Sequence, residues 1–316
     1  MGIKNRRNFL KNVALAPLCL GFGTSSWSFT SDRTKDFVAS NAKTKIKISL
    51  NAWSYNVPLY KHMKGESGGM SLFDLLEECA KLDFDAVDPT GYFFPGYPEV
   101  PQSKFINDFK RRAFQLGLDI SGTGIRNDFA TSDKAKRTAD IELAKRWIEA
   151  AAEMGAPVLR VFAGPQPEGH TWEETAQWLS EALAECADHG EKYGVLVGVQ
   201  NHGGMLKSAD EVLKILSMVQ SDWLGAIVDT GYFLTPDPYA DIERVIPKAV
   251  NWQVKSLLGD RKGGPINMEK LVAIIRASNY RGYVPIETLP ALGKEDEYDV
   301  FTQVPELLEA LRKAIG

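Results

Sequence analysis

The sequence predicts a single (β/α)8 barrel, and three observations support this fold class. The chain has 316 residues, of which 44% are hydrophobic and 25% charged, as in an ordinary folded protein. From Lys45 onward, short runs rich in β-branched residues alternate with longer segments of helical periodicity, which is typical of βαβ units and a parallel sheet. Eight strands and eight helices fit into this part of about 270 residues without a long linker, so one barrel is favoured over two domains.

The predicted elements follow one another in a regular order. Strands are expected at residues 46–51, 84–88, 118–122, 158–163, 195–200, 225–229, 252–255 and 283–287. Helices are expected at residues 72–82, 103–116, 133–154, 172–193, 209–219, 239–249 and 268–279, with a last one near 304–315. Helix starts are predicted at the capping residues Asp133, Thr171 and Ser208, and helix ends at Gly117, Gly155 and Gly194.

A doubly wound open sheet is the alternative arrangement of such an alternation. That fold is expected to carry a glycine-rich dinucleotide loop after its first strand. The segment at this place reads Asn51-Ala52-Trp53-Ser54-Tyr55 and contains no glycine. The barrel is therefore favoured.

The first part of the chain has the pattern of an export signal. The adjacent residues Arg6 and Arg7, followed by Phe9-Leu10-Lys11 and an apolar stretch at 13–22, resemble a twin-arginine signal peptide. The apolar stretch is too short to span a bilayer as a stable helix, and a basic amphipathic helix is the alternative interpretation. We expect a signal peptide at 1–30, a polar tether at 31–45 and the barrel at 46–316. The mature protein is then expected to be soluble, in the periplasm or outside the cell.

The charge of the chain argues against nucleic acid as a partner. Its formal net charge is −4, and the first 29 residues hold four basic residues and no acidic one. The remainder is therefore at −8, a surface that disfavours a phosphate backbone.

Polar residues end the predicted strands, and in a (β/α)8 barrel the active site lies at the C-terminal ends of the strands. This set comprises Asn51, Asp88, Arg126, Arg160, Gln200 with His202, Asp229, Gln253 with Lys255, and Glu287. We assign substrate contacts to Asn51, Trp53, Asp88, Arg126, Arg160 and Tyr232. For the two arginines, a salt bridge across the barrel mouth is the alternative role.

Four of these strand ends carry motifs, namely Gln200-Asn201-His202-Gly203, Asp229-Thr230-Gly231-Tyr232, Gln253-Val254-Lys255 and Ile286-Glu287. Together they resemble the sugar phosphate isomerase/epimerase group of xylose isomerase-like TIM barrels. That group shows Glu-Asn-His-Gly, Asp-x-Gly-His, His-x-Lys-Asp and Ile-Glu on strands five to eight. The resemblance covers the whole barrel in order.

The resemblance implies that the first three motifs each begin with a ligand of one divalent metal ion and that the last one ends with the fourth. The corresponding residues here are Gln200, Asp229, Gln253 and Glu287, where Gln200 replaces the usual glutamate and Gln253 the usual histidine. Two carboxylates and two amide oxygens suit a hard ion, so Mn²⁺ or Mg²⁺ is expected. The alternative is that the two glutamines mark a sugar-binding barrel without catalysis.

The same departure affects the expected catalytic residues, because ketose epimerases of this group use two glutamates on opposite faces of the substrate. Only Glu287 remains, since the amide of Gln200 is no base at neutral pH. His202 and Lys255 each follow an expected ligand by two residues and therefore share its strand face. We predict His202, Glu287 and Lys255 as catalytic residues, and His202 as the better replacement base because an unperturbed imidazole titrates near neutral pH.

The resemblance thus implies a metal-dependent sugar isomerase or epimerase that acts on a keto-sugar or related carbohydrate through an enediolate. β-Elimination on 3-keto-glycosides stays open as an alternative. The apurinic endonuclease branch of these barrels needs a histidine-rich cluster of three metals, whereas this chain has four histidines. We expect a small carbohydrate as partner, no nucleic acid and no membrane after export, and a homodimer stays open.

Overall fold

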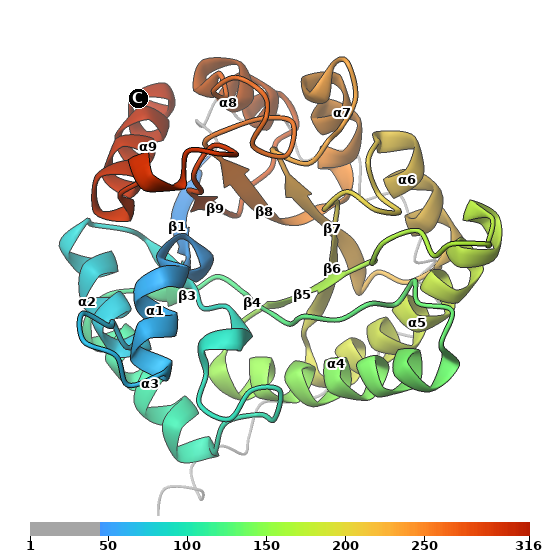
Figure 1. Ribbon diagram of the computed structural model, residues 1–316, viewed down its shortest axis with the longest axis horizontal. Coiled ribbons are helices and arrows are strands. Elements are labelled where there is room, and N and C mark those ends of the chain that lie inside the picture. The colour runs from blue at the N-terminus through green and yellow to red at the C-terminus, as the bar shows by residue number, and fades with distance from the viewer. Residues whose placement is uncertain (1–44) are drawn as a thin grey trace, which may run out of the picture. The chain divides into compact units, whose positions relative to one another are not determined.

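The computed structural model describes residues 45–316, and the predicted signal peptide and most of the tether lie outside them. The chain forms a ring of parallel strands surrounded by helices (Figure 1). The strands are β1 (Lys47–Asn51), β2 (Ala86–Asp88), β3 (Asp119–Ile120), β4 (Thr123–Gly124), β5 (Val158–Phe162), β6 (Leu196–Gln200), β7 (Leu224–Asp229), β8 (Ala249–Lys255) and β9 (Tyr283–Glu287). Their order is β3-β2-β1-β9-β8-β7-β6-β5-β4, and all pairs are parallel. The predicted (β/α)8 barrel is confirmed.

The ninth strand arises because the third barrel strand is split. β3 pairs with β2 and β4 pairs with β5, while Ser121 and Gly122 between them are not in a ladder. At this break the Ser121 N–H still bonds to the Val87 carbonyl at 2.9 Å, and side chains add further contacts. Asn251 donates from Nδ2 to the Ser121 carbonyl at 3.1 Å, and Ser49 Oγ contacts Ser121 Oγ at 2.6 Å. A bridge from Thr90 to Gly124 closes the ring.

The helices mostly match the predicted segments. They are α1 (Asn56–Met63), α2 (Leu72–Lys81), α3 (Ser103–Gln115), α4 (Lys134–Met154), α5 (Trp172–Tyr193), α6 (Ala209–Met218), α7 (Pro238–Val245), α8 (Met268–Ala277) and α9 (Val300–Ile315). The predicted caps are confirmed at the starts of α4, α5 and α6, where Asp133, Thr171 and Ser208 accept backbone hydrogen bonds. Among residues 45–316, no helix is long and apolar enough to cross a membrane.

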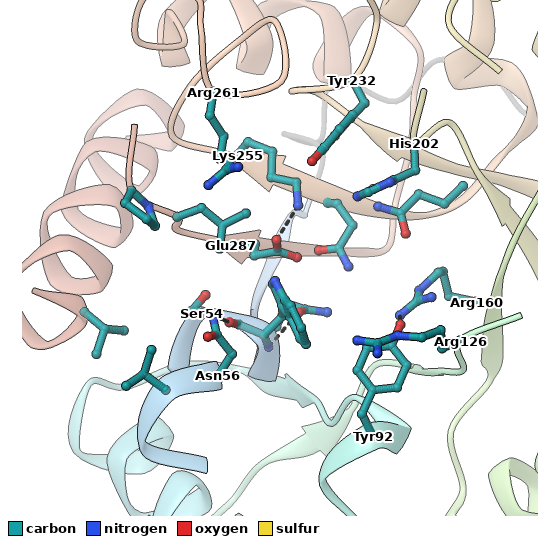
Figure 2. Close-up of a pocket in the computed structure, with 18 of the residues that line it drawn as sticks. Ser54, Asn56, Tyr92, Arg126, Arg160, His202, Tyr232, Lys255, Arg261 and Glu287 are labelled. Carbon is teal, nitrogen blue, oxygen red and sulfur yellow. Dashed lines mark hydrogen bonds and ion pairs between the residues drawn. The ribbon is translucent and has the colours of Figure 1, made fainter. Parts of the chain in front are cut away.

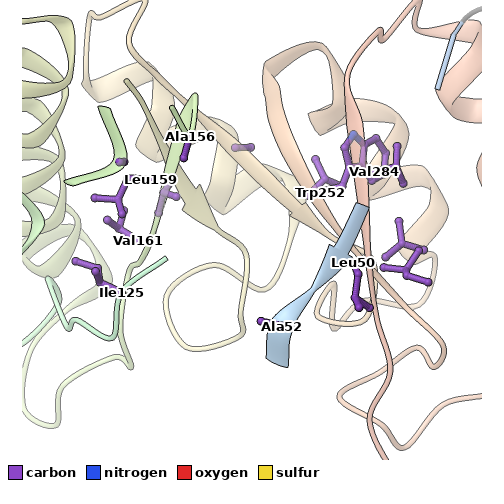
Figure 3. Packing of buried hydrophobic residues seen from close by; sticks show 14 of the residues in the cluster. Leu50, Ala52, Ile125, Ala156, Leu159, Val161, Trp252 and Val284 are labelled. Carbon is purple, nitrogen blue, oxygen red and sulfur yellow. The ribbon is translucent and has the colours of Figure 1, made fainter. Parts of the chain in front are cut away.

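The core lies between the strands and the surrounding helices. Strand residues such as Leu50, Leu159, Val161 and Val284 are fully buried (Figure 3). Parallel strands covered by helices bury apolar side chains and leave polar ones mainly at the strand ends. The register then aligns these ends: Asn51 lies beside Asp88, Asp229 beside Gln253, and Lys255 beside Glu287. The fold thus places the polar strand ends at one level of the barrel.

Candidate active site

A cavity of about 1020 Å³ opens at the C-terminal ends of the strands, which is room for a sugar-sized ligand. Figure 2 shows side chains from opposite walls that point into it. Ten of the twelve predicted site residues line it, namely Asn51, Trp53, Arg126, Arg160, Gln200, His202, Tyr232, Gln253, Lys255 and Glu287. The remaining two, Asp88 and Asp229, are buried and do not line the cavity.

Asp229 at the end of β7 is fully engaged by its neighbours. Its Oδ1 accepts from the Gly231 amide at 2.9 Å, and its Oδ2 accepts from Gln200 Nε2 at 2.6 Å. Asn201 holds the same residue through its backbone, with bonds of 2.8 and 2.9 Å to the Asp229 N–H and carbonyl. Burial raises the pKa of Asp229 to about 7, and the nearby Lys255 cation opposes that shift.

Lys255 lies between the two carboxylates of the site. Its Nζ donates to Glu287 Oε1 (Figure 2). The same Nζ lies 3.5 Å from Asp229 Oδ2. Desolvation lowers the pKa of this ammonium, but Asp229 and Glu287 outweigh it and the net shift is upward, so Lys255 stays charged. Gly231 makes room for the lysine stem, because a Cβ there would lie 2.7 Å from Lys255 Cγ.

The four predicted metal ligands converge, but their arrangement does not fit a divalent ion between them. Each oxygen of Asp229 already accepts a hydrogen bond, and the Lys255 ammonium lies between the carboxylates of Asp229 and Glu287. Within residues 45–316, no group of three or more His, Cys, Asp or Glu side chains is placed to hold a metal ion, and the predicted set itself contains only two such side chains, Asp229 and Glu287. Gln200 Oε1 and Gln253 Oε1 are buried without a partner, so they offer acceptors but no negative charge. The expected Mn²⁺ or Mg²⁺ is therefore not supported by these contacts.

His202 lies in the cavity wall beyond the end of β6. Its ring stacks on Tyr232 with centroids 3.9 Å apart and meets Phe162 edge-on at 5.0 Å. Desolvation by these walls and the cations of Lys255 and Arg160 lower the pKa of the imidazole, although part of the ring is exposed to the cavity. The imidazole is therefore neutral at pH 7, and it titrates below the near-neutral range expected from its unperturbed value.

Two arginines form a cationic wall near His202, where Phe162 contacts both the imidazole and the Arg160 guanidinium. Buried Arg160 donates from Nη1 to the Ile125 carbonyl and from Nη2 to the Tyr92 hydroxyl, each at 2.6 Å. The guanidinium groups of Arg126 and Arg160 both lie over the Tyr92 ring, at 4.9 and 5.5 Å from its centroid. Neither arginine forms a salt bridge with another described residue, so the alternative role as a salt bridge at the mouth is not observed.

Local backbone chemistry explains why these cationic side chains fit. A Cβ on Gly124 would lie 2.6 Å from Arg160 Nη2, so only glycine leaves room for the guanidinium at the end of β4.

The Asn51 side chain accepts a hydrogen bond from the Trp53 backbone N–H at 2.9 Å and so starts the short 3₁₀ turn after β1. The Trp53 ring, half-buried, meets Tyr92 edge-on at 5.6 Å.

Other cavity residues were not predicted from the sequence. Lys61 of α1 and Arg261 in the loop after β8 both line the cavity. Arg261 has a φ of 66°, a conformation that L side chains seldom adopt. Neither residue ends a strand, so the strand-end rule gives no signal for them. Their cationic charges add to those of Arg126, Arg160 and Lys255 around the opening.

Comparison with known proteins gives the family. A family model described as a xylose isomerase-like TIM barrel matches residues 76–313. The chain belongs to this family. Comparison with curated protein sequences gives no match.

Several solved structures share the fold of this xylose isomerase-like barrel. The 3-keto-D-glucoside 4-epimerase from E. coli is 14% identical, with 86% of this chain and 100% of that chain covered and a TM-score of 0.66. D-Psicose 3-epimerase from Clostridium cellulolyticum H10 is 14% identical, with 85% of this chain and 99% of that chain covered and a TM-score of 0.66. A D-tagatose 3-epimerase-like protein is 20% identical, with 85% of this chain and 100% of that chain covered and a TM-score of 0.65. At these identities, the likeness establishes the fold.

Proposed function

We propose that this barrel is a sugar isomerase or epimerase that moves a proton next to the carbonyl group of a keto-sugar. The observation that carries the proposal is the Glu287 carboxylate in the cavity wall, held by its ion pair with Lys255. Oε1 takes part in the ion pair, which leaves Oε2 for the substrate. The sugar epimerases among the structures of the same fold support the choice of substrate class.

The proposed reaction begins with proton removal by Glu287. Its carboxylate takes the proton from the carbon beside the carbonyl, the C–H electron pair forms a C=C bond, and the carbonyl π electrons move to oxygen. The product is an enediolate, and Glu287 now carries the proton. Return of a proton to the former carbonyl carbon, with the hydroxyl proton of the other carbon passing to the former carbonyl oxygen, gives isomerisation. Return of a solvent proton to the opposite face of the same carbon re-forms the carbonyl and gives epimerisation, and Glu287 then releases its own proton to solvent.

The two arginines define where the rest of the substrate binds in this proposal. Arg126 and Arg160 face the cavity from the wall opposite Glu287 (Figure 2). Guanidinium groups donate hydrogen bonds to hydroxyl and anionic oxygens. Contact with the Tyr92 ring holds the guanidinium groups of Arg126 and Arg160 in place. We place the hydroxylated or anionic end of the sugar against this wall.

Hydrogen exchange tests the proposal directly. The protein is incubated in D₂O with a panel of keto-sugars and 3-keto-glycosides, with and without Mn²⁺, and deuterium at the carbon beside the carbonyl is measured by NMR. We expect uptake with at least one substrate and a loss of about 10²-fold or more for Glu287→Gln. Glu295→Gln is the matched control, because Glu295 also lines the cavity but is exposed.

Each other outcome decides against the proposal in a different way. Release of the aglycone from a 3-keto-glycoside, without isomerised or epimerised product, would assign the alternative β-elimination. Binding of sugars without deuterium uptake would assign a sugar-binding barrel without catalysis. Equal exchange by wild type and Glu287→Gln would remove Glu287 as the base.

A further inference from the structure

We propose that this barrel works with the Lys255 ammonium as its cation and without the divalent metal ion, because Gln200 and Gln253 replace two of the four ligands that the family motifs imply. The catalytic part of this inference rests on the proposed function, whereas the absence of metal binding is tested without any substrate. The observation behind it is that Lys255 Nζ contacts Glu287 Oε1 and lies 3.5 Å from Asp229 Oδ2. These carboxylates are the only acidic members of the four-residue set implied by the family motifs.

Charge around the ammonium disfavours a second cation. A divalent ion beside Nζ would be repelled twice as strongly as a single charge at the same distance. Lys255 is buried, so little water screens that repulsion. The ammonium also lies 5.6 Å from the Tyr232 ring centroid, so its surroundings attract a cation from a third direction.

The side chains that could bind a metal ion at this site are too weak as ligands to displace the lysine. Both oxygens of Asp229 accept hydrogen bonds, from Gly231 and from Gln200, so its carboxylate is satisfied without an ion. The two glutamines contribute neutral amides, and only one oxygen of Glu287 stays free. The unpartnered Oε1 atoms of Gln200 and Gln253 are buried neutral acceptors, so they add no negative charge that would hold a divalent ion.

The lysine supplies part of what a metal ion would supply. As the enediolate forms, negative charge builds up on the former carbonyl oxygen. An ammonium positioned in advance donates a hydrogen bond to that oxygen and keeps its own protons, so no further reactant is needed. Its contact with Glu287 places the cation beside the base that removes the proton.

Mn²⁺ binding to three forms of the full-length protein tests this inference. The forms are wild type, Gln200→Glu with Gln253→His, and the same pair combined with Lys255→Met. Binding is followed by calorimetry and by the EPR signal of free Mn²⁺, and metal content is measured after purification. Circular dichroism and thermal unfolding check that each form is folded.

We expect one Mn²⁺ per chain in the triple variant, at least tenfold weaker binding when Lys255 is retained, and no stoichiometric metal in wild type. One tightly bound ion in wild type would overturn the inference, as would equal affinity of the two variants. If a variant does not fold, wild-type metal content and titration still decide.

The catalytic part has its own measurement. Deuterium exchange by wild type should survive treatment with a chelator, and Lys255→Met should lower it by about 10²-fold or more. Loss of exchange after chelation, restored by Mn²⁺, would overturn the inference while leaving the proposed function intact. Absence of exchange in every form would count against the proposed function, and the metal-binding result would still hold.

Discussion

Asp88 shows how burial of a carboxyl group beneath the cavity makes the molecule sensitive to pH. It ends β2 and is almost fully buried, and burial raises its pKa to about 6 against the nearby Arg160 cation. The folded protein therefore holds a proton on Asp88 in a range where the unfolded chain, with a pKa near 3.8, has released it. The contribution of this group to stability is largest below about pH 4 and falls as the pH rises to about 6.

Asp88→Asn should remove this dependence. We expect the stability of the variant relative to wild type to rise by up to about 3 kcal/mol between pH 4 and pH 7, since one pKa unit corresponds to about 1.4 kcal/mol. The measurement is the free energy of unfolding in urea at both pH values. Because the other titrating groups are common to both proteins, they cancel in the difference. A difference that does not change with pH would show that Asp88 is not protonated in the folded protein.

His202 gives a second prediction at the residue scale. We expect His202→Gln to keep the fold and to lower turnover by about 10²-fold or more, because the neutral imidazole lines the cavity and can relay a proton between solvent and the substrate. Glutamine retains hydrogen bonding but cannot stack on Tyr232 as the imidazole does at 3.9 Å. Because the pKa of His202 is lowered, the pH profile between about pH 6 and 8 should keep its shape in the variant. Near-native turnover would show that His202 has no role in the reaction.

The positions of most site residues were predictable from the sequence, but their contacts were not. Six of the eight strands end where predicted, at Asn51, Asp88, Gln200, Asp229, Lys255 and Glu287, because polar residues that close apolar runs lie at one end of a parallel barrel. Arg160 instead lies within β5, and Arg126 lies beyond the end of β4. The contacts of the site residues were not predictable. The ion pair of Lys255 with Glu287 depends on the register of β8 against β9, and the Asp229 contacts depend on which way Gln200 turns. Whether two carboxylates surround a metal ion or a lysine is therefore a property of the fold.

At the scale of elements, long amphipathic segments were the easiest to predict. α5 has the predicted bounds, and α4 and α6 begin where capping residues were identified. Three regions differ for local reasons. The strand expected at 118–122 ends at Ile120 and resumes at Thr123 as β4, β8 begins at Ala249 next to a shift in its register with β7, and α9 continues through Pro305 from the Asp299 cap.

The helix α1 was not predicted at all. It spans eight residues with Pro58 in its first turn, and much of its outer surface is exposed. Such a short segment shows little helical periodicity, because few turns repeat the pattern. The structure places it beside the cavity, where Lys61 contributes to the lining.

Two neighbouring glycines give a prediction for the strands. Gly198 of β6 pairs with Gly225 of β7, and a Cβ on either would overlap a neighbouring side chain, Ile227 or Val250 respectively. We expect Gly198→Ala and Gly225→Ala each to lower the free energy of unfolding by about 1–3 kcal/mol, the usual cost of overpacking a core. Gly264→Ala is the control, since nothing lies within 4 Å of its Cβ position. Equal stability of all three variants would contradict this account of the packing.

At the scale of the whole molecule, all strands of the barrel lie between Lys47 and Glu287. β1 pairs with both β2 and β9, so the ring is closed by residues on the C-terminal side of the tether. The family model matches from residue 76, and the first strand was predicted from its pattern alone. Removal of the segment before Lys45 would therefore leave every strand pair in place.

Export is the prediction that concerns this preceding segment. We propose that Arg6 and Arg7 direct twin-arginine translocation and that the mature protein begins between Gly23 and Lys45. Replacing both arginines with lysine should leave the precursor in the cytoplasm, because the twin-arginine export machinery recognises the adjacent arginines. Cell fractionation and N-terminal sequencing measure the outcome.

The control replaces Lys4 and Lys11 with arginine, which keeps the charge and should not affect export. Since both pairs precede Lys47, thermal unfolding of the barrel should be the same in all forms. Unchanged periplasmic yield of the Arg6 and Arg7 variant would remove the assignment.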